Sequence, residues 1–282
     1  MRYIVIHIKS PDQRGIISLY TEMLSSLSIN ILKLEQHVEP DDNLFFMRIE
    51  AELLEDKTSI EGLKDHLSKT DSKVDGNSKV FDKQKKQNIA ILVTKESLPL
   101  YDILIKNQTQ ELNSNIKTII SNHKVLEPIS DQFNIEYRYL DLSDKSYAEK
   151  ELLSILDQEQ IDLIILARYM QMIPDSIVNR YKDRVINIHH GFLPAFKGQK
   201  PYHKAWERGV KIIGATSHYV TSELDEGPII SQDVVSVDHH HSIKEMINSG
   251  RNLERNVLVD AIKAHLEYRI MNHGRRTIVF NQ

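Results

Sequence analysis

Apolar and polar positions change their spacing several times within the first 82 residues of the chain. Apolar side chains that alternate with polar ones predict strands, and apolar side chains at every third or fourth position predict helices. On this basis we expect strands over residues 3–8, 29–38, 44–51 and 73–81 and helices over residues 16–27 and 59–67. This order is that of a ferredoxin-like βαββαβ domain, which we place at residues 1–82.

A polar stretch at residues 83–88 separates this domain from a second pattern. The stretch is charged but short and has no aromatic side chain, so we interpret it as a solvated linker rather than a nucleic-acid contact. Beyond it we expect strands over 89–93, 116–120, 136–140, 163–167, 185–188, 212–220 and 229–237 and helices over 100–105, 124–133, 147–156, 203–208 and 243–266. Continuous apolar runs such as 163–167 are typical of parallel strands covered on both faces. Residues 89–282 are therefore predicted to form a Rossmann-like α/β domain with an open, mostly parallel sheet.

Composition narrows the range of functions. The chain has 282 residues, a net charge of −4 and no cysteine. Disulfides, thiolate metal sites and cysteine nucleophiles are thereby excluded, and a reducing, cytoplasmic compartment is consistent with this usage. The charge balance provides no basic footprint for nucleic acid. We expect no signal peptide at the amino terminus, and no apolar run approaches the ~18 residues of a membrane helix.

Three polar side chains lie where strands of the second domain end. Asn187 and His189 are two residues apart at the end of one apolar run, so in extended backbone they face the same side. Asp225 follows the next strand. An amide can stabilise a developing oxyanion, an imidazole can move a proton, and a carboxylate can orient the imidazole. Open α/β sheets bind ligands at this edge, which favours chemistry at an acyl carbon.

Taken singly, each of the three has an ordinary structural interpretation. Asn187 and Asp225 suit turns, and His189 is one of 13 histidines in the chain. The three residues in combination favour a functional site, and so does the loop at 191–198, which is framed by glycine and proline. His218, at the end of the strand leading to Asp225, is expected to contact the trio without touching the reacting molecule itself.

The same residues carry a family resemblance. Asn187-Ile188-His189, with Leu193-Pro194 downstream and the turn at 224–228, resembles the folate-dependent formyltransferase family. The resemblance spans roughly the last 195 residues and is densest from Leu163 to Gln232. It implies that Asn187, His189 and Asp225 are catalytic. It also implies that the following residues bind the folate: Arg168, Met170, Gln171, Met172, Ile173, Thr221, Ser222 and Leu224.

Within that family the chain resembles the deformylase branch. Its first 82 residues resemble an ACT domain, the small ligand-sensing module that precedes the catalytic domain in that branch. The turn at 94–99 lacks the glycines of a phosphate cradle, and no basic tRNA-binding domain is expected after residue 282. Two features depart from the branch: Leu98-Pro99 replaces a His-Cys pair, and Gly191 stands where serine is common.

The resemblance implies hydrolysis of 10-formyltetrahydrofolate to tetrahydrofolate and formate, which would supply formate for purine synthesis and balance one-carbon folate pools. Two alternatives remain open: a formyltransferase with a small amine acceptor, and a non-catalytic folate or amino-acid sensor. We expect no tightly bound cofactor and no metal, and we interpret Asp238 to His241 as a solvent loop.

The first domain offers one further candidate site. Asp12 to Gly15 opens its first helix, where amide hydrogens could bind the carboxylate of an amino-acid effector. An ordinary strand-to-helix turn explains the same residues equally well. Ferredoxin-like sheets have exposed edges that commonly pair, so a homo-oligomer is expected.

Overall fold

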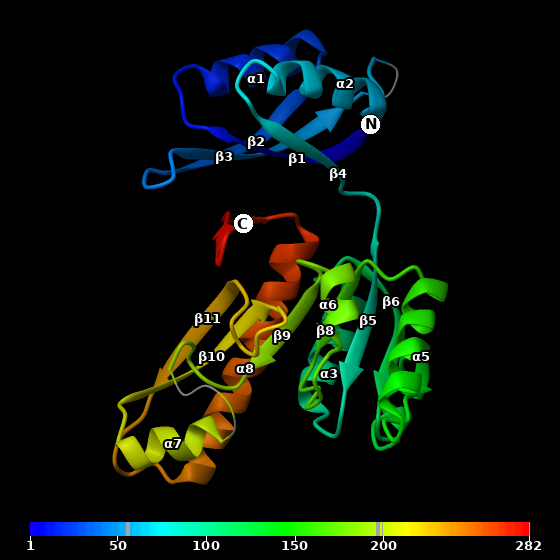
Figure 1. The fold of residues 1–282 in the computed structure, drawn as a ribbon, viewed down its shortest axis with the longest axis vertical. Coiled ribbons are helices and arrows are strands. Elements are labelled where there is room, and N and C mark those ends of the chain that lie inside the picture. Colours follow the sequence, from blue (N-terminus) through cyan, green and yellow to red (C-terminus); the bar gives the residue numbers. More distant parts are fainter. Residues whose placement is uncertain (55–56, 196–197, 199, 282) are drawn as a thin grey trace. The chain divides into compact units, whose positions relative to one another are not determined.

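The computed structural model describes residues 1–54, 57–195, 198 and 200–281. These residues form two compact units (Figure 1). The first unit contains residues 1–86 together with 267–271 and 278–282, and the second contains residues 87–266 and 272–277. Among the described residues, no helix combines the length and apolarity needed to cross a membrane.

The first unit is a four-stranded antiparallel sheet in the order β2-β3-β1-β4 with two helices. Its elements are β1 (Arg2–Pro11), α1 (Ile16–Ser26), β2 (Asn30–Glu39), β3 (Leu44–Leu53), α2 (Ile60–Asp71) and β4 (Asn77–Asp82). The strand–helix–strand–strand–helix–strand order predicted from the sequence is confirmed. Helix α2 begins where the Ser59 hydroxyl accepts a hydrogen bond from the Gly62 amide, an ordinary N-cap.

The core of the first unit lies between the sheet and the two helices. The alternate residues Ile4, Ile6 and Ile8 of β1 face Tyr20 and Leu24 of α1 in one buried cluster. The opposite face of the sheet carries a different set, in which Phe46 packs with residues from the end of the chain. This alternation follows from the two-residue period of a strand.

The second unit is built on a seven-stranded sheet in the order β11-β10-β9-β8-β5-β6-β7. Its strands are β5 (Gln87–Val93), β6 (Ser114–Ser121), β7 (Glu136–Tyr139), β8 (Leu163–Leu166), β9 (Val185–His189), β10 (Ile212–Tyr219) and β11 (Ile229–Ser236). The pairs from β9 through β8, β5 and β6 to β7 are parallel, whereas β10 pairs antiparallel with both β9 and β11. The predicted mostly parallel α/β sheet is confirmed.

Helices of the second unit cover its sheet. They are α3 (Leu98–Gln108), α4 (Glu127–Gln132), α5 (Lys145–Gln158), α6 (Asp175–Arg180), α7 (Pro201–Arg208) and α8 (Ile243–Leu266). Helices α5 and α6 share a buried cluster with β5 and β8. The long helix α8 contacts β9, β10, β11 and α3. A hairpin of β12 (Ile270–His273) and β13 (Arg276–Val279) follows.

Candidate active site

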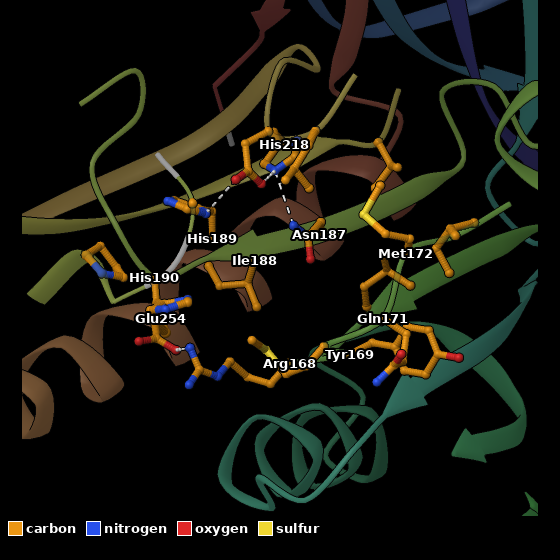
Figure 2. Close-up of a pocket in the computed structure, with 18 of the residues that line it drawn as sticks. Arg168, Tyr169, Gln171, Met172, Asn187, Ile188, His189, His190, His218 and Glu254 are labelled. Carbon is orange, nitrogen blue, oxygen red and sulfur yellow. Dashed lines mark hydrogen bonds and ion pairs between the residues drawn. The ribbon is translucent and has the colours of Figure 1, made fainter. Parts of the chain in front are cut away.

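The end of β9 and the neighbouring strand β10 bring the predicted polar residues together. Asn187 and His189 lie on β9, and the antiparallel register places Asn187 opposite His218 and His189 opposite Thr216 of β10. Asp225 lies in the connection from β10 to β11, with a φ of 57°. Three segments of the chain thus contribute to one group of side chains (Figure 2).

His189 and Asp225 form a buried pair. Nδ1 of His189 lies 3.3 Å from Oδ2 of Asp225, and the two side chains are only 5% and 7% exposed. Burial opposes ionisation of Asp225, but the hydrogen bond and positive charge of His189 outweigh it and hold the pKa of Asp225 below its ordinary value. Nε2 of His189 has no hydrogen-bond partner among the described residues. The ring therefore has one nitrogen fixed by a carboxylate and one available for a reacting molecule.

His218 orients the amide of Asn187. Nδ1 of His218 lies 2.9 Å from the carbonyl oxygen of Tyr219, so this nitrogen carries the hydrogen and donates it. Nε2 then accepts from Nδ2 of Asn187, 3.3 Å away. Burial lowers the pKa of His218, which favours the neutral ring that this arrangement requires. Among the described residues, the remaining amide hydrogen of Asn187 has no acceptor.

Two glycines permit these approaches. A Cβ at Gly227 would lie 1.6 Å from the carbonyl oxygen of Tyr219, so only glycine lets the loop bearing Asp225 return against β10. A Cβ at Gly191 would lie 3.0 Å from Nε2 of His189. The glycine at position 191 therefore leaves the free face of the imidazole uncovered.

The trio faces a cavity of about 700 Å³. Every folate-binding residue expected from the sequence lines it: Arg168, Met170, Gln171, Met172, Ile173, Thr221, Ser222 and Leu224. Asn187, His189, His218 and Asp225 line it as well. Met170 and Met172 are exposed at its surface, and their side chains are flexible and apolar.

Further lining residues were not anticipated from the sequence. Tyr202 comes from α7, and Ile247, Arg251 and Glu254 come from α8. One signal could have revealed Glu254: it falls on the buried stripe of α8 defined by Met246, Gly250, Val257 and Ala261. A charged residue on an apolar helix face is rarely buried without a partner.

The remaining features that we singled out in the sequence lie in three different parts of the chain. Asp12 and Gly15 belong to the first unit, and Gly15 is the N-cap of α1 with a φ of 89°. Within the expected loop at 191–198, Phe196 and Lys197 lie outside the described residues. Asp238 and His241 contact each other at 2.8 Å on the surface. No group of three or more potential ligands among the described residues is arranged to hold a metal ion.

Comparison with known proteins identifies the family. The formyl transferase family model matches residues 87–262. A formyltetrahydrofolate deformylase of Bacillus subtilis (strain 168) is 40% identical over 280 residues, which cover 97% of this chain and 92% of the relative. This chain belongs to the formyltetrahydrofolate deformylase family.

Solved structures of the formyltetrahydrofolate deformylase family are similar over the whole chain. The crystal structure of the Pseudomonas syringae deformylase covers 100% of this chain with a TM-score of 0.95 and 38% identity, and the alignment spans 95% of that structure. The deformylase of Burkholderia mallei gives a TM-score of 0.91 at 32% identity, with full coverage of both chains. The similarity therefore includes both compact units, and the formyl transferase match includes all three residues of the trio.

Proposed function

We propose that this chain hydrolyses 10-formyltetrahydrofolate to tetrahydrofolate and formate. The observation that carries the proposal is the group formed by Asn187, His189 and Asp225 around one cavity, in a chain similar along its full length to formyltetrahydrofolate deformylases. The formyl group is supplied by the substrate itself. We propose no tightly bound cofactor.

In this mechanism the formyl oxygen accepts a hydrogen bond from the free amide hydrogen of Asn187. Water adds to the formyl carbon, and the oxygen gains negative charge that Asn187 stabilises. His189, held at Nδ1 by Asp225, moves a proton at Nε2 and delivers it toward N10 as the carbon–nitrogen bond breaks. The products are formate, a proton and tetrahydrofolate, so the atoms of one water are fully accounted for.

The apolar part of the cavity is proposed to bind the pterin ring. Backbone groups from Met170 to Ile173 supply hydrogen-bond donors and acceptors, and their side chains supply apolar contact. Thr221, Ser222 and Leu224 lie across the same cavity on the loop that bears Asp225. Folate binding and the placement of the catalytic carboxylate would thus depend on one loop.

We further infer that the first unit is an ACT domain that binds an amino-acid effector and pairs with a second copy of the chain. Its βαββαβ order and exposed edge strand β2 support this inference. Asp12 and Gly15 at the start of α1 are the proposed effector contacts. We place the enzyme in the cytoplasm, where its formate would supply purine synthesis.

The decisive experiment is formate release from 10-formyltetrahydrofolate by the pure chain with no acceptor added. Asn187→Ala is expected to lower kcat by about 10²–10³-fold, because one oxyanion donor is lost. Asn115→Ala, an exposed position on β6, is the matched control and should keep wild-type turnover. Near-normal turnover of Asn187→Ala would contradict the assignment, and absence of any turnover in the wild type would favour a sensor.

A further inference from the structure

The cavity continues past the catalytic trio on two sides that differ in chemistry. Figure 2 shows Gln171 and Met172 on one side of Asn187 and shows Glu254 and His190 on the other. The side chain of Arg168 extends toward Glu254. We call the second side the charged end, and it is lined by Arg168, His190, Tyr202, Arg251 and Glu254.

The charged end is organised around one buried carboxylate. Glu254 is 2% exposed. One of its oxygens accepts a hydrogen bond from the Tyr202 hydroxyl at 2.8 Å, and the other lies 3.3 Å from Nη1 of Arg168. Burial raises the pKa of Glu254, and the guanidinium of Arg168 opposes that rise. Removal of either Arg168 or Glu254 would therefore leave the charge of the other residue uncompensated in the cavity wall.

The backbone is shaped to hold this pair. Arg168 follows β8 with a φ of 61°, a left-handed conformation that non-glycine residues seldom adopt. Its carbonyl oxygen accepts a hydrogen bond from the Thr94 hydroxyl at 2.8 Å. On α8, a Cβ at Gly250 would lie 2.0 Å from the Tyr202 hydroxyl, so glycine is what lets Tyr202 reach Glu254. Strained backbone of this kind persists where surrounding contacts enforce it, often at functional sites.

The ion pair of Arg168 and Glu254 affects which second reactant, water or an amine, can attack the formyl group. A molecule that approaches the formyl carbon from the charged end meets Arg168 and Glu254. Water is small enough to leave their ion pair in place. A substituted amine is larger than water, and displacing Arg168 to admit it would leave a buried carboxylate without its cation, which is strongly unfavourable.

Charge acts in the same direction. Amine acceptors are cationic at neutral pH until they lose a proton. Arg168 is paired with Glu254, and Arg251 lies 3.3 Å from a carboxylate oxygen of Glu96, so both guanidinium groups of the charged end have a carboxylate partner. Burial lowers the pKa of His190 to about 3, so this ring is neutral and cannot accept charge from the incoming amine without cost. Among the described residues of the charged end, an ammonium group would therefore find no unpaired carboxylate, whereas water needs none.

We propose that Arg168, held by Glu254 and Tyr202, is the specificity-determining residue that restricts the second reactant to water. The inference rests on the proposed deformylase function and deepens it. In its absence an amine nitrogen could attack the formyl carbon, the bond to N10 would break, and the proton lost by the amine would pass to N10. The product would then be a formylated amine in place of formate.

The test measures how the formyl group is divided between water and an added amine. Full-length wild type and Arg168→Gly are incubated with 10-formyltetrahydrofolate and increasing glycinamide, and formate and N-formylglycinamide are quantified by mass spectrometry. Glycine suits the left-handed φ at position 168. The wild type should yield formate at every glycinamide concentration. Arg168→Gly should raise the ratio of formylated amine to formate at least ten-fold, in proportion to glycinamide.

Two further variants keep the result interpretable. Glu254→Gln retains an acceptor for Tyr202 but loses the ion pair, and it should raise the same ratio to a smaller extent. Arg255→Ala, on the same helix but paired with Asp102 and absent from the cavity wall, should match the wild type. If both Arg168→Gly and Glu254→Gln consume substrate yet release formate alone, the inference is overturned. Failure of the wild type to release formate without amine would instead overturn the proposed function.

Discussion

Asp225 lies close to two imidazole rings, and its contact with His189 depends on its charge. Oδ2 lies 3.3 Å from His189 and Oδ1 lies 3.7 Å from Nε2 of His218. Asp225→Asn keeps the size of the side chain but removes the negative charge that stabilises protonated His189. We expect kcat for formate release to fall by about 10²–10⁴-fold while KM changes little. Steady-state kinetics with the exposed variant Asp238→Asn as control checks this, and an unchanged kcat would refute the pairing.

The site was predictable residue by residue only where local geometry suffices. Asn187 and His189 share a face because they are two positions apart in a strand, so their proximity followed from the sequence. Asp225 reaches them through a loop with a left-handed residue, which no periodic pattern encodes. The pairing of Arg168 with Glu254 joins the end of β8 to the middle of α8, and only the folded chain brings these together.

At the scale of elements, the longest pattern gave the bounds of its helix, and some of the short elements were missed. Helix α8 runs over Ile243–Leu266, the range expected from its apolar stripe. Helix α6 and strands β12 and β13, with six, four and four residues, were not predicted, whereas the equally short β7 and β8 lie within predicted strands. The antiparallel pairing of β9 with β10 was not predicted either. Buried strands have the same apolar sequence pattern whether they pair parallel or antiparallel.

The loop from β10 to β11 is the element on which the site depends most. Its ends are joined where the amide of Tyr219 donates to the carbonyl of Pro228 at 2.9 Å, and Gly227 lies against the same backbone. Gly227→Ala should force the loop outward and move Asp225 away from His189. We expect at least a ten-fold loss of kcat and a lower melting temperature. Gly209→Ala, at the C-cap of α7 in open space, is a control for activity, and equal activity of the two variants would contradict this account.

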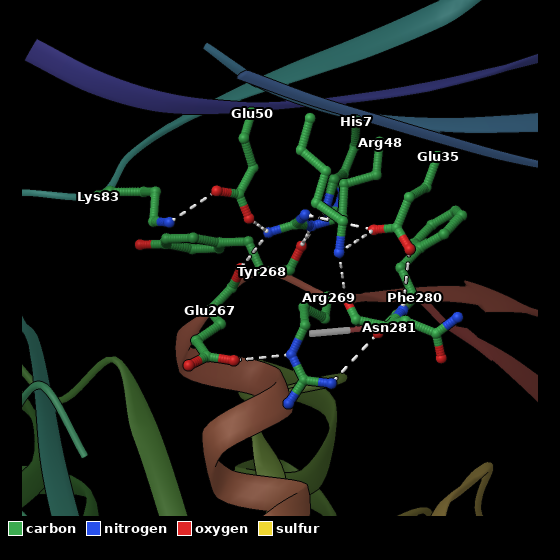
Figure 3. Close-up of polar contacts among 11 residues, drawn as sticks. His7, Glu35, Arg48, Glu50, Lys83, Glu267, Tyr268, Arg269, Phe280 and Asn281 are labelled. Atoms are coloured by element: carbon green, nitrogen blue, oxygen red, sulfur yellow. Dashed lines mark hydrogen bonds and ion pairs between the residues drawn. The ribbon is translucent and has the colours of Figure 1, made fainter. Parts of the chain in front are cut away.

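At the scale of the whole chain, the first unit includes two segments from the end of the sequence, 267–271 and 278–282. Phe280 and Met271 pack with Phe46, and Asn281 donates its amide hydrogen to Glu35 (Figure 3). The domain limits expected from the sequence place these segments in the second domain. Composition changes along a chain mark linkers, but they carry no information on which distant segment returns to pack against a sheet.

Arg48 holds one of these segments. It is 1% exposed, and its guanidinium donates to the carbonyls of Tyr268 at 2.7 Å and Glu267 at 2.9 Å. Arg48→Met fills similar volume but leaves both carbonyls and Glu50 without this donor (Figure 3). We expect the free energy of unfolding to fall by about 3 kcal/mol. Arg14→Met, at an exposed position, should change it by less than about 0.5 kcal/mol in denaturant titrations. A similarly small change for Arg48→Met would show that the contact does not matter.

Buried histidines make the stability of the chain depend on pH. Burial lowers the pKa of His7 to about 4 and that of His265 to about 4, and for His7 the charge of Arg48 adds to the effect. The folded state therefore binds fewer protons than the unfolded state between the ordinary histidine pKa near 6.5 and about 4, so stability is lost as pH falls through this window. Each such histidine contributes a slope of about 1.4 kcal/mol per pH unit. His7→Gln keeps a donor for the Tyr268 carbonyl but does not titrate, so its unfolding free energy should fall less steeply between pH 6.5 and 4.5. Parallel curves for the variant and the wild type would show that His7 does not contribute.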